Sequence, residues 1–262
     1  GTQRLVATEA GPVRHKVDIY TPSRFFLGYL GHDLGGAVVP ADWLTFSEQK
    51  LRTITGGAVF HDEVGLEDAR RRVAYYPRDV WLYLLAAGWA RVGQEEHLMG
   101  RAGLAGDEVG SALIGARLVR DVMRLCFLME RTYAPYPKWL GTAFGRLACA
   151  AELSSHLRGA LAAGTWRERE AHLVSAYEAA ARMHNGLGIT DPLPETARGF
   201  FGRPFRVMAL HGFANALLAR ITDDRLRALA RRPLIGGIDQ WSDSTDLVSY
   251  AEWRPLLRRL YE

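Results

Sequence analysis

One face of a predicted helix carries a regular series of charged side chains. The series consists of Arg117, Arg120, Asp121, Arg124 and Arg131. Its successive arginines are separated by three, four and seven residues, which places them along one side of a helix. Because four arginines accompany one aspartate, we interpret Arg117, Arg120 and Arg124 as candidate contacts for a substrate phosphate or carboxylate. The structural alternative is a salt-bridge network in which Asp121 pairs with its neighbouring arginines.

Two adjacent carboxylates, Glu95 and Glu96, lie where the apolar helix predicted over residues 80–90 becomes polar. A carboxylate near the C-terminal end of a helix interacts unfavourably with the helix dipole, which favours a specific role for the pair. If one of them points inward, burial raises its pKa toward the range that suits a general base. Each is a candidate catalytic base, and a solvated pair at a helix end is the alternative.

Lys138 lies in a group of aromatic residues, Tyr133, Tyr136 and Trp139. Such a group can stack on a nucleotide base through its rings while its cation contacts the phosphates. Ordinary packing explains the same residues equally well. Lys138 is therefore a candidate substrate contact with a structural alternative.

Asp18 lies between the apolar residues Val17 and Ile19. This alternation is typical of a strand, on which Asp18 faces the side opposite to both neighbours. One carboxylate on a strand says little by itself, because an exposed or salt-bridged aspartate fits the same pattern.

Several longer motifs resemble one family. The segments YPRDVWLYLLAA at 76–87, QEE at 94–96 and RTYAPYPKWLG at 131–141 are similar to the bacterial domain-of-unknown-function family DUF4037, which is attached to a nucleotidyltransferase fold of the DNA-polymerase-beta type. The shorter segments at 40–44, 49–51, 184–185, 239–240 and 243–246 fit the same pattern. The resemblance covers nearly the whole chain, but the family itself is uncharacterised.

The resemblance implies a magnesium-dependent reaction. In nucleotidyltransferases, a Gly-Ser turn precedes an Asp-x-Asp strand, and these carboxylates with a third one hold two Mg²⁺ ions. Asp18 matches the third carboxylate and would be a catalytic residue and metal ligand, with Glu95 or Glu96 as the base. The turn and the Asp-x-Asp strand are absent here, so we expect the two-metal site only in the complete protein.

The sequence predicts that the elements positioning these residues form an α+β fold that is mostly α. Strands are expected at 4–8 and 16–21, as the edge of a nucleotidyltransferase-like mixed sheet whose other strands precede residue 1. Residues 1–36 would form this remnant, and residues 37–262 an antiparallel helical-bundle domain. Helices are expected at 40–55, 66–74, from 77 through the apolar run, 107–131, 137–163 with a break near 152–155, 166–187, 204–221, 222–231 and near the C-terminus, with 236–246 as a polar loop.

The composition of the 262 residues is that of a globular protein, with 48% hydrophobic residues and a net charge of +4. No apolar run reaches the roughly 18 residues of a membrane span, and no signal peptide is recognisable, so we expect a cytoplasmic protein with no membrane partner. Cys126 and Cys149 are interpreted as buried reduced thiols.

Three hypotheses for the function follow. The first is a nucleotidyltransferase that moves a nucleoside monophosphate from a nucleoside triphosphate to a hydroxyl of a small molecule or RNA, with Mg²⁺ as cofactor. In this hypothesis Arg117, Arg120, Arg124 and Lys138 bind the substrate. The second is a non-catalytic helical module that binds a nucleotide, a metabolite or RNA. The third is a structural or homodimerising helical domain, which is favoured if the arginine face is fully paired internally.

Overall fold

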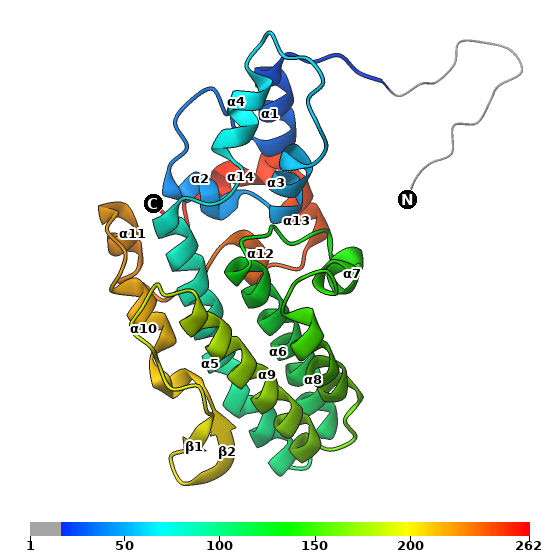
Figure 1. The fold of residues 1–262 in the computed structure, drawn as a ribbon, viewed down its shortest axis with the longest axis vertical. Helices are drawn as coiled ribbons and strands as arrows, with labels where there is room; N and C mark the ends of the chain where they lie inside the picture. Colours follow the sequence, from blue (N-terminus) through cyan, green and yellow to red (C-terminus); the bar gives the residue numbers. More distant parts are fainter. Residues whose placement is uncertain (1–16) are drawn as a thin grey trace, which may run out of the picture.

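The computed structural model describes residues 17–262 (Figure 1). Fourteen α-helices, three single-turn helices and one two-stranded sheet make these residues an α+β, mostly α, structure. The elements are α1 (Pro22–Leu30), α2 (Pro40–Thr45), α3 (Glu48–Thr55), α4 (Leu66–Arg72), α5 (Arg78–Leu104), α6 (Glu108–Met129), η1 (Pro137–Trp139), α7 (Leu140–Phe144), α8 (Ala150–Ala162), α9 (Trp166–Gly186), β1 (Arg198–Phe200), β2 (Arg203–Val207), η2 (Ala209–His211), α10 (Phe213–Leu218), α11 (Asp224–Leu229), α12 (Ile238–Trp241), α13 (Thr245–Ser249), η3 (Ala251–Trp253) and α14 (Arg254–Arg258).

The four long helices α5, α6, α8 and α9 form a bundle, and α10 and the β hairpin pack on α5 (Figure 1). Every residue from Val80 to Trp89 is buried, as the apolar run in α5 predicts. Further along α5, Gly100 and Gly103 leave room for the rings of Phe205 and Trp166, which would collide with a side chain at either position. The central helix is therefore covered on all sides over its first three turns and closely packed near its end.

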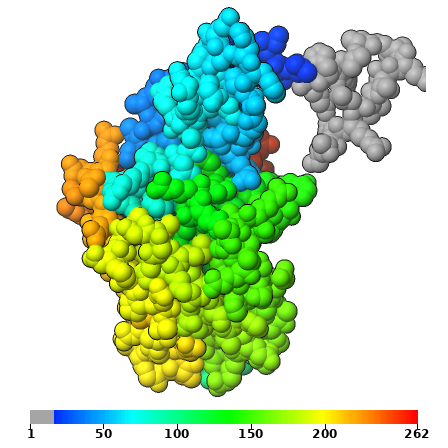
Figure 2. Space-filling view, viewed as in Figure 1, coloured from blue at the N-terminus to red at the C-terminus, as the bar shows by residue number. Residues whose placement is uncertain are grey.

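Short helices close one end of the bundle. Helices α1 to α4 lie there with α13 and α14, so that the two ends of the described chain meet (Figure 1). The buried carboxylate of Asp42 joins them, because it accepts a hydrogen bond from the Val39 N–H and pairs with Arg254 and Arg258 of the C-terminal segment. The space-filling view shows this end continuing into the bundle as one body (Figure 2).

The strand expected at 16–21 is not formed by its described residues, 17–21. Residues 17–21 form neither strand nor helix, and the strand expected at 4–8 lies outside the described residues. Residues 17–20 are exposed and belong to no strand of the described chain, because apolar alternation alone does not make a strand. The helix α1 lies instead within the segment assigned to the sheet.

The sheet of the described chain is the antiparallel pair β1 and β2, and β2 overlaps the start of the helix expected at 204–221. In β2 the side chains of Phe205 and Val207 are buried and Arg206 between them is exposed, which is a period of two. Gly212, with φ +81°, separates this segment from α10. The expected helix at 204–221 is therefore limited to its last part.

Two other expected helices are divided. The helix expected at 40–55 is broken into α2 and α3, because the backbone at Phe46 is extended and the Glu48 N–H donates to Asp239 rather than to a helical carbonyl. The helix at 137–163 breaks between α7 and α8, at residues 145–149, and not at 152–155. The residues at 236–246 include the short helix α12. No helix within residues 17–262 has both the length and the apolar character of a membrane span.

Candidate functional site

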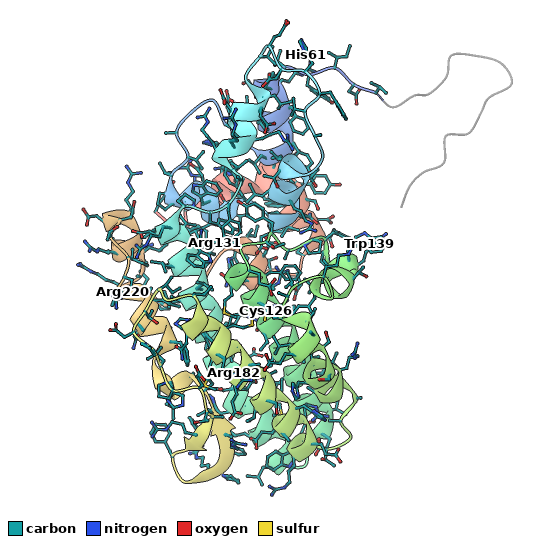
Figure 3. The ribbon with its side chains drawn as sticks, viewed as in Figure 1. His61, Cys126, Arg131, Trp139, Arg182 and Arg220 are labelled. Atoms are coloured by element: carbon teal, nitrogen blue, oxygen red, sulfur yellow. The ribbon has the colours of Figure 1, made fainter. Side chains whose placement is uncertain are left out.

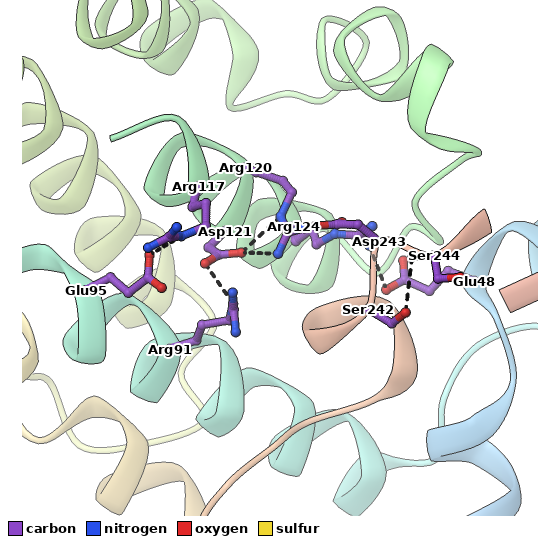
Figure 4. A network of polar contacts seen from close by, with 10 residues as sticks. All are labelled: Glu48, Arg91, Glu95, Arg117, Arg120, Asp121, Arg124, Ser242, Asp243 and Ser244. Carbon is purple, nitrogen blue, oxygen red and sulfur yellow. Dashed lines mark hydrogen bonds and ion pairs between the residues drawn. The ribbon is translucent and has the colours of Figure 1, made fainter. Parts of the chain in front are cut away.

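The arginine face of α6 points toward acidic side chains of neighbouring elements (Figure 4). The Nε atom of Arg117 donates to Glu95 of α5 at 2.8 Å. The guanidinium of Arg120 contacts Asp121 at 3.2 Å and also pairs with Asp243, which follows α12. Asp121 is buried and accepts a second charged bond, at 2.9 Å, from Arg91. Most of the charge on this face is therefore matched within the protein, as in the salt-bridge alternative.

Arg124 is the exception among the three candidate arginines of α6, Arg117, Arg120 and Arg124. Its side chain is buried, and its Nη1 atom lies 3.9 Å from Glu48 Oε1, too far for a hydrogen bond. Its Nε and Nη1 atoms have no hydrogen-bond partner among the described residues. The arginine face is thus not fully paired. The structural hypothesis is favoured only if the face is fully paired internally.

Glu48 and Asp239 form a pair of carboxylates next to Arg124. The backbone N–H of Glu48 donates to Asp239 Oδ2 at 2.8 Å, and Glu48 Oε2 accepts from the Ala134 N–H at 2.6 Å. Burial, followed by repulsion from Asp239, raises the pKa of Glu48 to about 7, while Arg124 opposes this shift. Burial likewise raises the pKa of Asp239. These groups join α3, α6 and α12 in the interior.

One of the two glutamates at 95 and 96 points inward. Glu96 is buried, and its carboxylate accepts hydrogen bonds from the N–H groups of Met208 and Ala209 at 2.7 and 3.0 Å. Burial raises its pKa to about 7, although both hydrogen bonds act in the opposite direction. Because both carboxylate oxygens hold the start of η2, Glu96 positions backbone in this structure. The assignment of Glu95 or Glu96 as a catalytic base stays a prediction.

Asp18 is exposed and precedes α1, in the segment that extends from the outer end of the molecule (Figure 1). Among residues 17–262, no three side chains of His, Cys, Asp or Glu lie close enough together to hold a metal ion. The described residues therefore do not fit a two-metal magnesium centre. Asp18 as a metal ligand stays a prediction.

A different group of predicted residues lies on an open surface. A hollow of about 500 Å³ is lined by Tyr29, Gln49, Arg52, Thr53, Pro135, Tyr136 and Trp139. A second hollow, of about 270 Å³, shares three of these residues and is lined by Arg52, Pro135, Trp139, Thr142, Ala143 and Arg146. We call the two together the aromatic groove. It runs between α3 on one side and η1 with α7 on the other.

The groove presents rings and cations to solvent. Trp139 is 54% exposed and Tyr136 is 38% exposed, high values for large aromatic side chains. The Lys138 ammonium lies 5.0 Å from the centre of the Trp139 ring. Arg52 donates from Nη1 to the Tyr133 carbonyl at 2.7 Å, which fixes its guanidinium at the wall of the groove. Figure 3 shows Trp139 at the edge of the molecule.

Sequence reasoning found one wall of the groove and missed the other. Lys138, Tyr136 and Trp139 come together as expected, whereas Tyr133 is buried beneath them against Tyr75 and Tyr76. The helical spacing of Gln49, Arg52 and Thr53, on the side of α3 opposite Leu51, was the available signal for the second wall. Arg117, Arg120, Arg124 and Lys138 are not among the described lining residues, although the Lys138 ammonium lies over the ring of Trp139, which is one of them.

The fold and the groove define a mostly helical α+β protein with a basic, aromatic surface hollow. Residues 43–140 of the chain match the model of the family described as Domain of unknown function (DUF4037), which confirms the resemblance over that segment. Most of the groove, from Gln49 to Trp139, lies within this match. No curated protein and no solved structure matches the chain.

Proposed function

We propose that this chain is a helical module that binds a nucleoside triphosphate in the aromatic groove. We propose further that the module serves a protein that transfers a nucleoside monophosphate to a hydroxyl of a small molecule or RNA. The observation that carries the first proposal is the exposure of Tyr136 and Trp139 beside Arg52, Lys138 and Arg146. The second proposal rests on the family resemblance.

The side chains of the groove suit both halves of a nucleotide. Stacking of a base on an exposed aromatic ring contributes ~1–3 kcal/mol and tolerates any base. Arginine holds phosphate oxygens through its planar fork, and lysine holds them as a point charge. The groove can therefore bind the base on Trp139 or Tyr136 and direct the phosphates toward Arg52, Lys138 or Arg146.

The charge available in the groove supports this choice over the arginine face of α6. Lys138 and Arg146 form no ion pair with any described residue, so their charge can act on a ligand. Arg117 and Arg120 already contact carboxylates, which a phosphate would have to displace.

The test is equilibrium binding of ATP, CTP, GTP and UTP, with and without Mg²⁺, to the wild-type chain and to Trp139→Ala. Loss of the stacking ring should weaken binding about tenfold, the equivalent of ~1.4 kcal/mol. The matched control is Trp253→Ala, since Trp253 is 47% exposed and lies outside the groove.

The control variant should bind like the wild type. Equal affinities of the Trp139 and Trp253 variants, or no binding of any of the four nucleotides, would contradict nucleotide binding in the groove. A short single-stranded RNA in the same assay tests the second candidate ligand. Binding of RNA without binding of mononucleotides would favour an RNA-binding module.

A further inference from the structure

A second cavity lies away from the groove, between the start of α2, the helix α11 and the C-terminal segment. It has a volume of about 350 Å³, within the range of small-molecule sites. Its apolar lining includes Val39, Leu229 and Tyr261, and its charged lining consists of Arg225, Arg232, Arg258 and Glu262. Figure 1 shows α11 and the C-terminal end on the side of the molecule opposite α7.

Two of the three arginines are held in place. Arg258 contacts Asp42 at 3.3 Å and Glu262 at 3.5 Å, and Arg232 donates to the Glu262 carbonyl at 2.7 Å. The Nε atom of Arg258 is buried and has no hydrogen-bond partner among the described residues. Guanidinium groups fixed in this way lose little conformational freedom when they bind an oxyanion.

The third arginine is uncommitted. The Arg225 side chain forms no hydrogen bond or ion pair with any described residue, yet it lines the cavity. Arg254 adds a further positive charge behind Asp42, so four guanidinium groups in this region are accompanied by two side-chain carboxylates, those of Asp42 and Glu262. The local charge of the described side chains is positive, and an anion of one or two charges would balance it.

The apolar wall restricts the kind of anion. The Tyr261 hydroxyl donates to the Gly236 carbonyl and accepts from the Trp241 indole N–H at 3.0 Å, so its ring stays fixed as a wall of the cavity. We propose that this cavity binds a small organic oxyanion, a carboxylate or phosphate attached to an apolar body, with the apolar part on Tyr261 and Leu229 and the oxyanion on Arg225 and Arg232. This site is independent of nucleotide binding in the aromatic groove.

The test is an NMR titration with benzoate, phenyl phosphate and inorganic phosphate. We expect benzoate or phenyl phosphate to bind more tightly than inorganic phosphate, and Arg225→Ala to weaken this binding at least fivefold. Arg231→Ala is the matched control, because it removes the same charge from an exposed residue that does not line the cavity. The comparison of benzoate with phenyl phosphate distinguishes a carboxylate ligand from a phosphate ligand.

Trp139→Ala separates this site from the groove, where phenyl phosphate also finds rings and cations. Binding that survives Trp139→Ala but is lost in Arg225→Ala assigns the ligand to the cavity. Failure of both organic anions to bind, equal losses in the Arg225 and Arg231 variants, or binding lost only with Trp139 would overturn the proposal.

Discussion

The arginine face of α6 and the aromatic groove are both basic, but their charges are used differently. On the face, Arg117 and Arg120 contact Glu95, Asp121 and Asp243. Beside the groove, Lys138 lies on the exposed ring of Trp139 and forms no ion pair with a described residue. A spacing pattern identifies arginines that share a helix face, but only the partners on other elements decide whether their charge is available to a ligand.

The largest effect on the free energy of unfolding is expected where the arginine face of α6 is buried most deeply. Asp121→Asn removes a buried charge that neutralises both Arg91 and Arg120. Breaking such a pair leaves uncompensated charge in the interior, so the free energy of unfolding should fall by about 3 kcal/mol. Urea denaturation followed by circular dichroism measures this loss.

Arg117→Ala provides the control on the same helix face. Arg117 is about half exposed, and a solvated pair such as Arg117–Glu95 contributes about 1 kcal/mol or less. If Asp121→Asn were no more destabilising than Arg117→Ala, the face would not be a structural network, and its role as a substrate clamp would regain support.

The second prediction concerns pH. The pKa of Glu96 is raised from its ordinary value of 4.5 to about 7, so the folded state binds this proton more tightly than the unfolded state. The resulting stabilisation is complete below the unfolded pKa and is lost as the pH rises through 7. Between pH 5 and 8, Glu96 should lower the free energy of unfolding by about 2 kcal/mol.

Glu96→Gln isolates this contribution, because an amide does not titrate in that range. Urea denaturation of both proteins at pH 5 and pH 8 should show a smaller difference for the variant, even though Glu48 titrates in each. Identical pH dependence in the two proteins would show that Glu96 is not the buried, proton-binding group described here.

The smallest effect on stability is expected in the groove. Lys138→Ala and Trp139→Ala remove exposed side chains, so each should change the free energy of unfolding by about 0.5 kcal/mol or less. Lys138→Ala should still weaken nucleotide binding a few-fold, with a larger loss at low salt because the interaction is electrostatic. A large loss of stability in either variant would place these residues in the core and remove the contrast with the α6 face.

The helices that the sequence predicts best are those with strong local signals. The apolar run in α5 and the Thr165–Glu168 capping box of α9 determine their elements locally. The break at Phe46 depends on a hydrogen bond between Glu48 and Asp239, which are far apart in the sequence. Local periodicity therefore does not indicate this break. The hairpin at 198–207 was missed because the alternation of Phe205, Arg206 and Val207 is too short for its period of two to distinguish a strand from part of a helix.

The aromatic groove and the arginine face were also predictable only in part, where their residues are close together in the sequence. The group around Lys138 is contiguous in sequence, so its composition alone indicated a stacking surface. The wall that contains Tyr29 and Arg52 comes from distant helices, and only the tertiary fold brings it to Trp139. For the same reason, the sequence showed the excess of arginine on α6 but not Glu48 and Asp243, which approach it from other elements.

The most direct test of the account is the response of individual tryptophan side chains to a nucleotide. The protein contains seven tryptophans, whose indole N–H signals can be followed by NMR and assigned by single Trp→Phe substitutions. We predict that adding ATP shifts the Trp139 signal in a saturable manner and leaves the exposed Trp253 signal unchanged. An unchanged Trp139 signal under conditions in which ATP binds the protein would contradict the assignment of the groove as the nucleotide site.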